Sequence, residues 1–341
     1  MRISALLLTC SLSLTSYAQG PVAVLEGRPS ADSELGIDLQ TFLGDPEPLV
    51  IRLVSEGSSL LTGPSPLLLL CDDVKSADSR ALSDRVRSAP SLILEDGSLI
   101  DWFNTLHRSK RATRLLHAIQ RHSREGKPLV GIAGGAAALA GAGVVLSSEL
   151  GEIPRNPHRD EALQVRVGLG WGPPTLIEAS RWGADRGLHL MGGPMRTLRL
   201  MERSYMKSAA HLGEGAGLIY EPIKSQIRVI GGGHVLFFET SSGHRNRHEL
   251  RGGRVSLLLR GDILDLSHDR LTASSQTPLL SRATHSFNKF LMEFASSPTT
   301  KPIFSSRHGH LLLRQRDDTQ IIKAGALARP LRAEFDLINS P

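Results

Sequence analysis

The segment that most restricts the fold of this chain is residues 128–140, which read PLVGIAGGAAALA. An apolar run followed by glycines and then by alanines predicts a β-strand that ends in a tight turn and enters a helix. A strained turn of this kind, the nucleophile elbow, lifts one side chain above the edge of an α/β sheet. The residue at that point here is Ala133. Because a methyl group has no proton to lose and no lone pair to donate, this side chain excludes covalent catalysis.

Two other interpretations of the same segment stay open at this stage. In the first interpretation, residues 129–145 form a single buried helix of small residues, and there is no elbow. In the second, the uncharged run 129–146 enters a membrane. Alanine and glycine insert weakly, and the run is short against the ~20 residues that a spanning helix needs.

Strand and helix patterns alternate through the first 130 residues. Short apolar runs predict buried strands, and amphipathic stretches at 77–87 and 110–125 predict helices between them. The predicted strands are residues 21–26, 48–54, 67–70, 91–94 and 129–130. This alternation predicts a doubly wound, mostly parallel sheet, whose binding sites lie at the carboxyl ends of the strands. Cys71, Asp96 and Ala133 each follow or end such a strand, so we expect them to share one crevice.

The remainder of the chain is less regular. We expect residues 151–186, which are rich in proline, to be an irregular excursion. Residues 218–266 have β character, with a hairpin loop at 244–248. Residues 271–341 are expected to form a C-terminal extension with a helix near 286–294 and strands at 311–314 and 319–323.

Composition and the N-terminus limit the possible partners. The 40 basic and 34 acidic residues are interspersed, which predicts no nucleic-acid partner. A basic start, a short apolar core and the triplet Ser16-Tyr17-Ala18 predict a signal peptide over 1–18 and therefore a secreted or periplasmic protein. Its removal takes Cys10 away and leaves Cys71 as the one cysteine. We expect no stable membrane span after cleavage, and no disulfide.

Several sequence patterns contain part of a metal site or of a phosphate site, but none is complete. The imidazoles of His308 and His310, like those of His244 and His248, lack the further ligands of a zinc site. Gly231-Gly232-Gly233 lacks the following Lys-Ser/Thr of a phosphate loop and predicts a β turn. We therefore expect neither a metal nor a cofactor.

Four motifs occur together over residues 85–266: the elbow, LGEGAGLIY at 212–220, IRVIGGGHVLFF at 227–238 and RGDILDL at 260–266. In this order and spacing they resemble the cyanophycinase and dipeptidase E group of serine peptidases. The resemblance implies a flavodoxin-like or class I glutamine-amidotransferase-like α/β domain, here over residues 19–270. It also implies that the family's attacking serine is replaced by Ala133.

The resemblance assigns roles to further positions. His189 is the counterpart of the family's base and Glu214 of its acid, each displaced by one or two residues from the family spacing. Asp96 and Gly97 fall where the family has the loop that frames the substrate. Arg196 and Arg199 match an arginine run that could hold a carboxylate through paired hydrogen bonds; the alternative is a solvated helix face. Together with the elbow glycines, the expected ligand-binding residues are Asp96, Gly97, Gly131, Gly134, Gly135, Arg196 and Arg199.

These observations favour a peptidase-family protein that has lost catalysis but kept a cleft for a peptide or a small anionic ligand. One alternative is an active hydrolase, for instance one in which His189 activates water. Another is an envelope scaffold or partner-binding protein that uses the fold without the site. A homo-oligomer is compatible with all three.

Overall fold

The computed structural model describes most of the first 274 residues and shorter stretches after them. The described residues are 20–27, 29–45, 47–53, 68–71, 74–108, 111–146, 163–179, 193–204, 206–240, 245–246, 249–274, 290–291, 295, 303–306, 309–314, 320–324 and 327–338. The predicted signal peptide and His189 lie outside them, as does most of the predicted helix at 286–294.

The first of two large sheets has a parallel core, which is built from residues 22–132. Its strand order is β18-β17-β13-β12-β1-β7-β4-β2-β3, in which β1, β7, β4, β2 and β3 are parallel neighbours. These five strands are β1 (Val22–Leu25), β2 (Leu49–Leu53), β3 (Leu68–Cys71), β4 (Leu92–Glu95) and β7 (Leu129–Ile132). All five predicted strands are therefore present, and the predicted α/β class with a parallel sheet is confirmed. The antiparallel remainder is β12 (Gly217–Glu221), β13 (Gln226–Ile230), β17 (Ile263–Asp265) and β18 (Arg270–Thr272).

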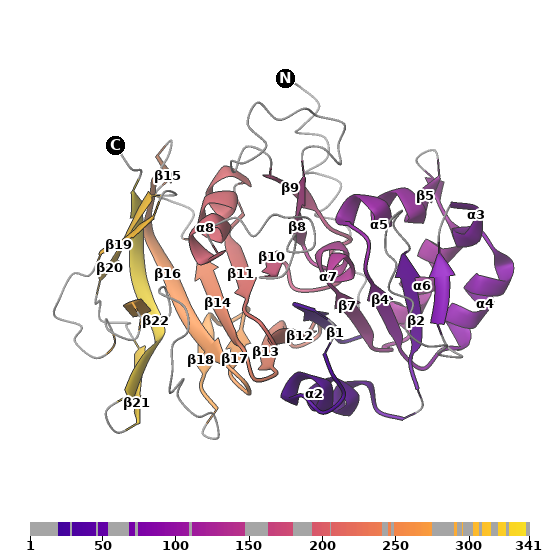
Figure 1. Ribbon diagram of the computed structural model, residues 1–341, viewed down its shortest axis with the longest axis horizontal. Helices are drawn as coiled ribbons and strands as arrows, with labels where there is room; N and C mark the ends of the chain where they lie inside the picture. Colours follow the sequence, from indigo (N-terminus) through magenta and orange to yellow (C-terminus); the bar gives the residue numbers. More distant parts are fainter. Residues whose placement is uncertain are drawn as a thin grey trace.

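Helices cover both faces of this sheet (Figure 1). On one face α2 packs through Leu35 and Leu39 against β1 and β7. The opposite face buries the apolar sides of five helices, α3 to α7, together with Val22, Val24 and Ile51. The helices are α2 (Glu34–Leu43), α3 (Val74–Ala77), α4 (Arg80–Ser88), α5 (Leu99–Leu106), α6 (Arg114–Arg124) and α7 (Gly134–Leu139).

Capping explains where the predicted helices differ from the observed ones. The helix predicted over 110–125 begins at Arg114, because the Thr113 hydroxyl accepts the Leu116 N–H at 3.4 Å; residues 107–108 and 111–112 instead pair as the short strands β5 and β6. The helix predicted over 77–87 begins later, as α4 at Arg80, since Ser79 caps its start and α3 ends at Ala77. Such a side-chain oxygen satisfies N–H groups that have no partner in the first helical turn.

The second sheet is larger and mainly antiparallel, and its strands lie between residues 142 and 338. Its order is β19-β20-β22-β16-β14-β11-β10-β8-β9, with β15 and β21 paired at its side. The α8 helix (Gly193–Ser204) packs on it. The strands are β8 (Ala142–Leu146), β9 (Leu163–Val167), β10 (Leu176–Ala179), β11 (Ser208–Leu212), β14 (His234–Glu239), β15 (Arg245–Asn246), β16 (Glu249–Leu259), β19 (Ile303–Ser306), β20 (Gly309–Arg314), β21 (Gln320–Ala324) and β22 (Leu327–Ile338).

One sequence expectation changes in this sheet, and another does so in part. The stretch 151–186 is not wholly irregular, because β9 and β10 lie within it and pair with β8. The predicted extension after residue 270 supplies β22, which pairs antiparallel with β16. The strands predicted at 311–314 and 319–323 are confirmed as β20 and β21. Of the hairpin loop predicted at 244–248, residues 245–246 instead form β15 and pair with β16, and the other three residues lie outside the described ones.

Within the part of the chain that the structure describes, no helix is long and apolar enough to cross a membrane. Residues 129–146 in particular form β7, a short helix α7 (Gly134–Leu139) and β8. Both the single-helix and the membrane interpretation of this segment are therefore wrong.

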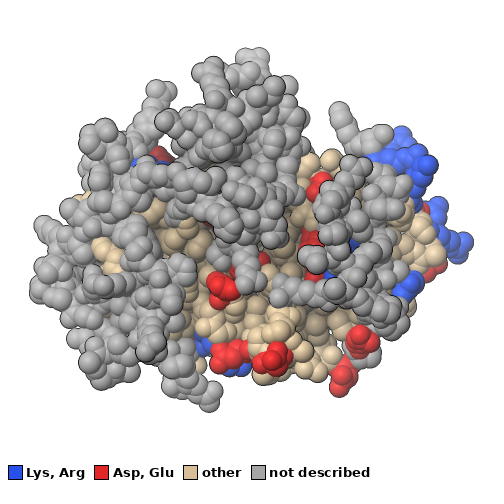
Figure 2. Space-filling model, in the orientation of Figure 1, with Lys and Arg blue, Asp and Glu red and all other residues tan. Residues whose placement is uncertain are grey.

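Basic side chains are most visible at one end of the molecule, over α3, α4 and β5 (Figure 2). They are balanced locally, since Arg80 and Arg87 pair with Asp84, and Arg108 pairs with Asp78. This agrees with the interspersed charges of the sequence.

Candidate functional site

The predicted elbow is present at the carboxyl end of β7. Ala133 follows the last residue of β7 with φ 53° and ψ −115°, and α7 begins at Gly134. A non-glycine residue with positive φ is strained, because its Cβ crowds the backbone. The Ala133 side chain is partly exposed, whereas every residue of α7 is buried. The turn therefore displays this methyl group at the edge of the sheet, as the sequence predicts.

The elbow glycines allow direct contact with the end of β4. A Cβ on Gly135 would lie 2.0 Å from the Leu94 carbonyl oxygen, and one on Gly134 would lie 1.8 Å from that of Gly97. A Cβ on Gly131 would lie 2.6 Å from the Gly135 carbonyl oxygen. Glycine is required where two backbones approach so closely. These contacts account for all three glycines through packing, and they place Gly97 beside the elbow as predicted.

The loop after β4 is held rigidly. Asp96 and Gly97 both have positive φ, 61° and 67°. The Trp102 indole N–H donates to the Asp96 carbonyl oxygen at 2.9 Å. The Arg52 guanidinium, from β2, donates to the Glu95 carboxylate at 2.6 and 3.0 Å, and its Nε lies 3.2 Å from Asp96 Oδ2. The ion pair with Glu95 is buried, while the Asp96 side chain is 50% exposed. Asp96 thus presents a fixed, half-exposed carboxylate next to the elbow.

Three charged residues of this edge were missed in the sequence analysis. Glu26 follows β1, whose last residue Leu25 pairs with Ile132, so Glu26 occupies the place on β1 that Ala133 occupies on β7. It is 4% exposed, and Arg52 and Glu95 are also buried. A charge within or directly after a predicted buried strand is unusual, because burying it unpaired is costly. That pattern could have identified all three.

The remaining candidates for catalysis are His189, Glu214 and Cys71. His189 lies outside the described residues. Glu214 is exposed in the turn after β11, two residues before Ala216, whose carbonyl accepts the Glu26 backbone N–H at 3.2 Å. Cys71 ends β3 and is separated from β4 by β2. Within the described residues, no group of three or more His, Cys, Asp or Glu side chains could hold a metal ion.

The two arginines of the family-like run are not on a solvated helix face, and that alternative is wrong. Arg196 and Arg199, in α8, are 6% and 7% exposed. Arg196 pairs with the buried Glu178 of β10, and Arg199 Nη1 lies 2.6 Å from Glu202 Oε2. Both charges therefore have partners within the chain, and a ligand carboxylate would have to compete with Glu178 or Glu202. These pairs belong to α8 and the second sheet.

Comparison with known proteins gives no family. No protein-family model matches the chain, and no curated protein matches it. Among solved structures, the crystal structure of a peptidase from an acI-B1 Actinobacterium is similar over 74% of this chain and 100% of that chain, with 11% sequence identity and a TM-score of 0.48. A likeness of this size does not establish membership of a family.

Proposed function

We propose that this protein is a catalytically inactive relative of the cyanophycinase-like serine peptidases, and that it binds a peptide at the carboxyl edge of its first sheet. The observation that carries the proposal is the backbone of Ala133. Its positive φ corresponds to about 1–3 kcal/mol of backbone strain. An alanine side chain cannot react, so this strain serves no catalytic step. Such a turn is expected where an ancestral nucleophile was displayed and later lost. Export after removal of residues 1–18 is part of the same proposal.

The charges at this edge favour a peptide over a small anion. Asp96 offers a half-exposed carboxylate, and the neighbouring Arg52 is already shared between Glu95 and Asp96. Glu26 places a further acidic residue at the same edge. A carboxylate attracts an ammonium or guanidinium group and repels an anion. We therefore infer that the ligand brings a positive group, such as a peptide amino terminus, to Asp96, while the Ala133 methyl contacts it without reacting.

A binding and turnover assay tests this proposal. The probe is the dipeptide Ala-Ala, with N-acetyl-Ala-Ala as the form that lacks the positive charge. We expect calorimetry to detect the free dipeptide and chromatography to show no hydrolysis of it. Asp96→Asn should weaken binding about tenfold, because one charge-assisted hydrogen bond is lost. Asparagine tolerates positive φ, so this variant should fold.

Ala133→Gly is the matched control for the stability of the turn and for hydrolysis. It removes the methyl group and relieves the strain, so it should raise the free energy of unfolding by about 1 kcal/mol and leave the protein without hydrolytic activity. Hydrolysis by the wild-type protein would contradict the loss of catalysis and favour the active hydrolase. Equal binding of the free and acetylated dipeptides, or none of either, would contradict the proposed ligand and favour a scaffold.

A further inference from the structure

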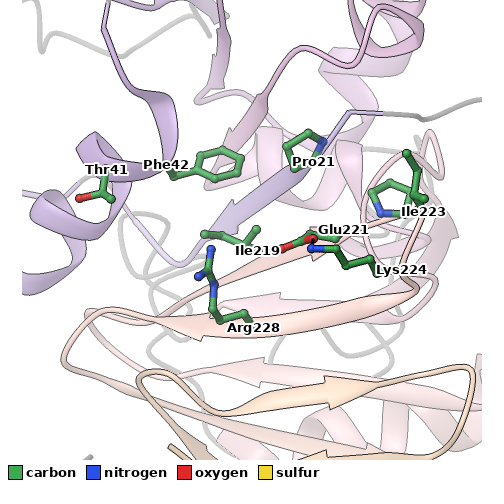
Figure 3. Close-up of a pocket in the computed structure, with 9 residues that line it drawn as sticks. Pro21, Thr41, Phe42, Ile219, Glu221, Ile223, Lys224 and Arg228 are labelled. Atoms are coloured by element: carbon green, nitrogen blue, oxygen red, sulfur yellow. Dashed lines mark ion pairs between the residues drawn. The ribbon is translucent and has the colours of Figure 1, made fainter. Parts of the chain in front are cut away.

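A pocket of about 430 Å³ opens at the other end of the same sheet, beside the start of β1 (Figure 3). Pro21 and the turn between β12 and β13 contribute to its wall. The elbow lies at the carboxyl end of the parallel strands and this pocket at their amino end, separated by the four residues of β1, or about 13 Å. The volume falls within the roughly 300–1,000 Å³ of small-molecule sites. It is therefore a second, separate candidate site.

One part of the pocket is apolar. Phe42, from the last turn of α2, and Ile219, from β12, line it together with Ile223 of the β12–β13 turn. Ile219 is 2% exposed and belongs to the core beneath, whereas Ile223 is 83% exposed. Only Ile37 and Ile223 are exposed large apolar side chains among the described residues. An isoleucine so exposed at the rim of a pocket is suited to contact with an apolar ligand.

The polar part carries one cation without a partner. Lys224 Nζ lies 2.5 Å from Glu221 Oε2, so these two charges compensate each other. Arg228 of β13 pairs in register with Ile219 and stands on the same face of the sheet. Figure 3 shows its side chain rising toward Ile219. Within the described part of the chain, the exposed Arg228 guanidinium makes no ion pair or hydrogen bond.

We propose that this pocket binds a carboxylate attached to an apolar chain. The Arg228 guanidinium receives the carboxylate, since its planar donors match both oxygens. Phe42, Ile219 and Ile223 contact the chain. Among the described lining residues, Arg228 is the one uncompensated cation, and a single positive charge suits one negative charge better than the two of a phosphate. The pocket thus selects a monoanion with an apolar tail, supplied either as a free acid or as the C-terminus of an apolar peptide.

Calorimetric titration of the full chain with four probes tests the ligand class. Octanoate should bind at least tenfold more tightly than 1-octanol, which has the same chain without the charge, and more tightly than inorganic phosphate. N-acetyl-Leu-Leu and its C-terminal amide distinguish the two sources. A peptide acid that binds more tightly than octanoate indicates a C-terminus, and the reverse order indicates a free acid. The proposal would be overturned if octanol bound as tightly as octanoate, or if phosphate bound more tightly than both.

Three variants test the residues. Arg228→Gln should weaken the binding of octanoate about tenfold. Glu221→Gln should strengthen this binding severalfold, because Lys224 then becomes available to the carboxylate. Arg111→Gln, an exposed arginine on β6, is the control and should change nothing. Octanoate affinity that is unaffected by Arg228→Gln would overturn the assignment. Asp96→Asn should leave octanoate binding intact, so failure at this pocket is distinguishable from failure at the elbow.

Discussion

The two ends of the first sheet are built from the same strands but differ in how their residues are constrained. At the carboxyl end, backbones touch directly at Gly134 and Gly135, and Asp96 and Ala133 are held at positive φ. At the amino end the chain leaves an open pocket with an exposed Ile223. Strain persists only where the surrounding structure fixes it. At the rigid end, direct contacts between backbones therefore fix the strained turn at Ala133, while the open end offers a charge that has no partner among the described residues.

The largest expected effect concerns the buried ion pair at the carboxyl end. Arg52→Met should lower the free energy of unfolding by about 3–5 kcal/mol, because Glu95 is left buried without its main partner. Denaturant unfolding at neutral pH measures this loss. Arg80→Met is the control, since its pair with Asp84 is exposed and worth at most about 1 kcal/mol. The double variant Arg52→Met/Glu95→Leu should recover much of the loss. If Arg52→Met and Arg80→Met both lowered the free energy of unfolding by a similarly small amount, the carboxyl end would not be the more constrained one.

A smaller loss is expected from closing the contact between the elbow and β4. Gly135→Ala would place a Cβ 2.0 Å from a backbone oxygen, and overpacking of this kind costs about 1–3 kcal/mol. Gly126→Ala is the matched control, because Gly126, just after α6, has φ 78° and an added Cβ there would meet no atom within 4 Å. That variant should lose about 1 kcal/mol from backbone strain alone. Thermal or denaturant unfolding compares the two, and an equal loss would contradict the close approach of the two backbones.

The smallest effect is a pH dependence at the amino end. Burial lowers the pKa of His122, in α6, although its Nε2 lies 3.2 Å from the Pro128 carbonyl oxygen just before β7. Since the unfolded chain then binds the proton more readily, stability is complete above the unfolded pKa of about 6.5 and falls as the pH drops below it. The slope contributed by His122 should reach at most about 1.4 kcal/mol per pH unit.

Unfolding measured between pH 7.5 and 5 tests this dependence. His122→Gln should be less stable than the wild type at pH 7.5 and should lose less stability on acidification. If the variant has the same pH dependence as the wild type, another group is responsible.

Local patterns predicted much of the first sheet. Its five parallel strands and the elbow were each visible as an apolar run followed by small or polar residues. The second sheet was harder to predict, since β22 pairs with β16 across about 80 residues of chain. Which distant strand becomes a neighbour depends on the packing of the whole chain. The same holds for Arg196, whose burial against Glu178 follows from how α8 packs on the second sheet.

The sequence by itself determined that a tight turn stands at residue 133 and that its side chain is chemically inert, because turn propensity and side-chain chemistry are properties of a few adjacent residues. The tertiary structure alone decided which charges are neutralised. Arg52 meets Glu95 from a neighbouring strand, whereas Arg228 meets no partner in the described chain. Burial and pairing arise only when distant segments come together, so no local pattern could distinguish these two arginines.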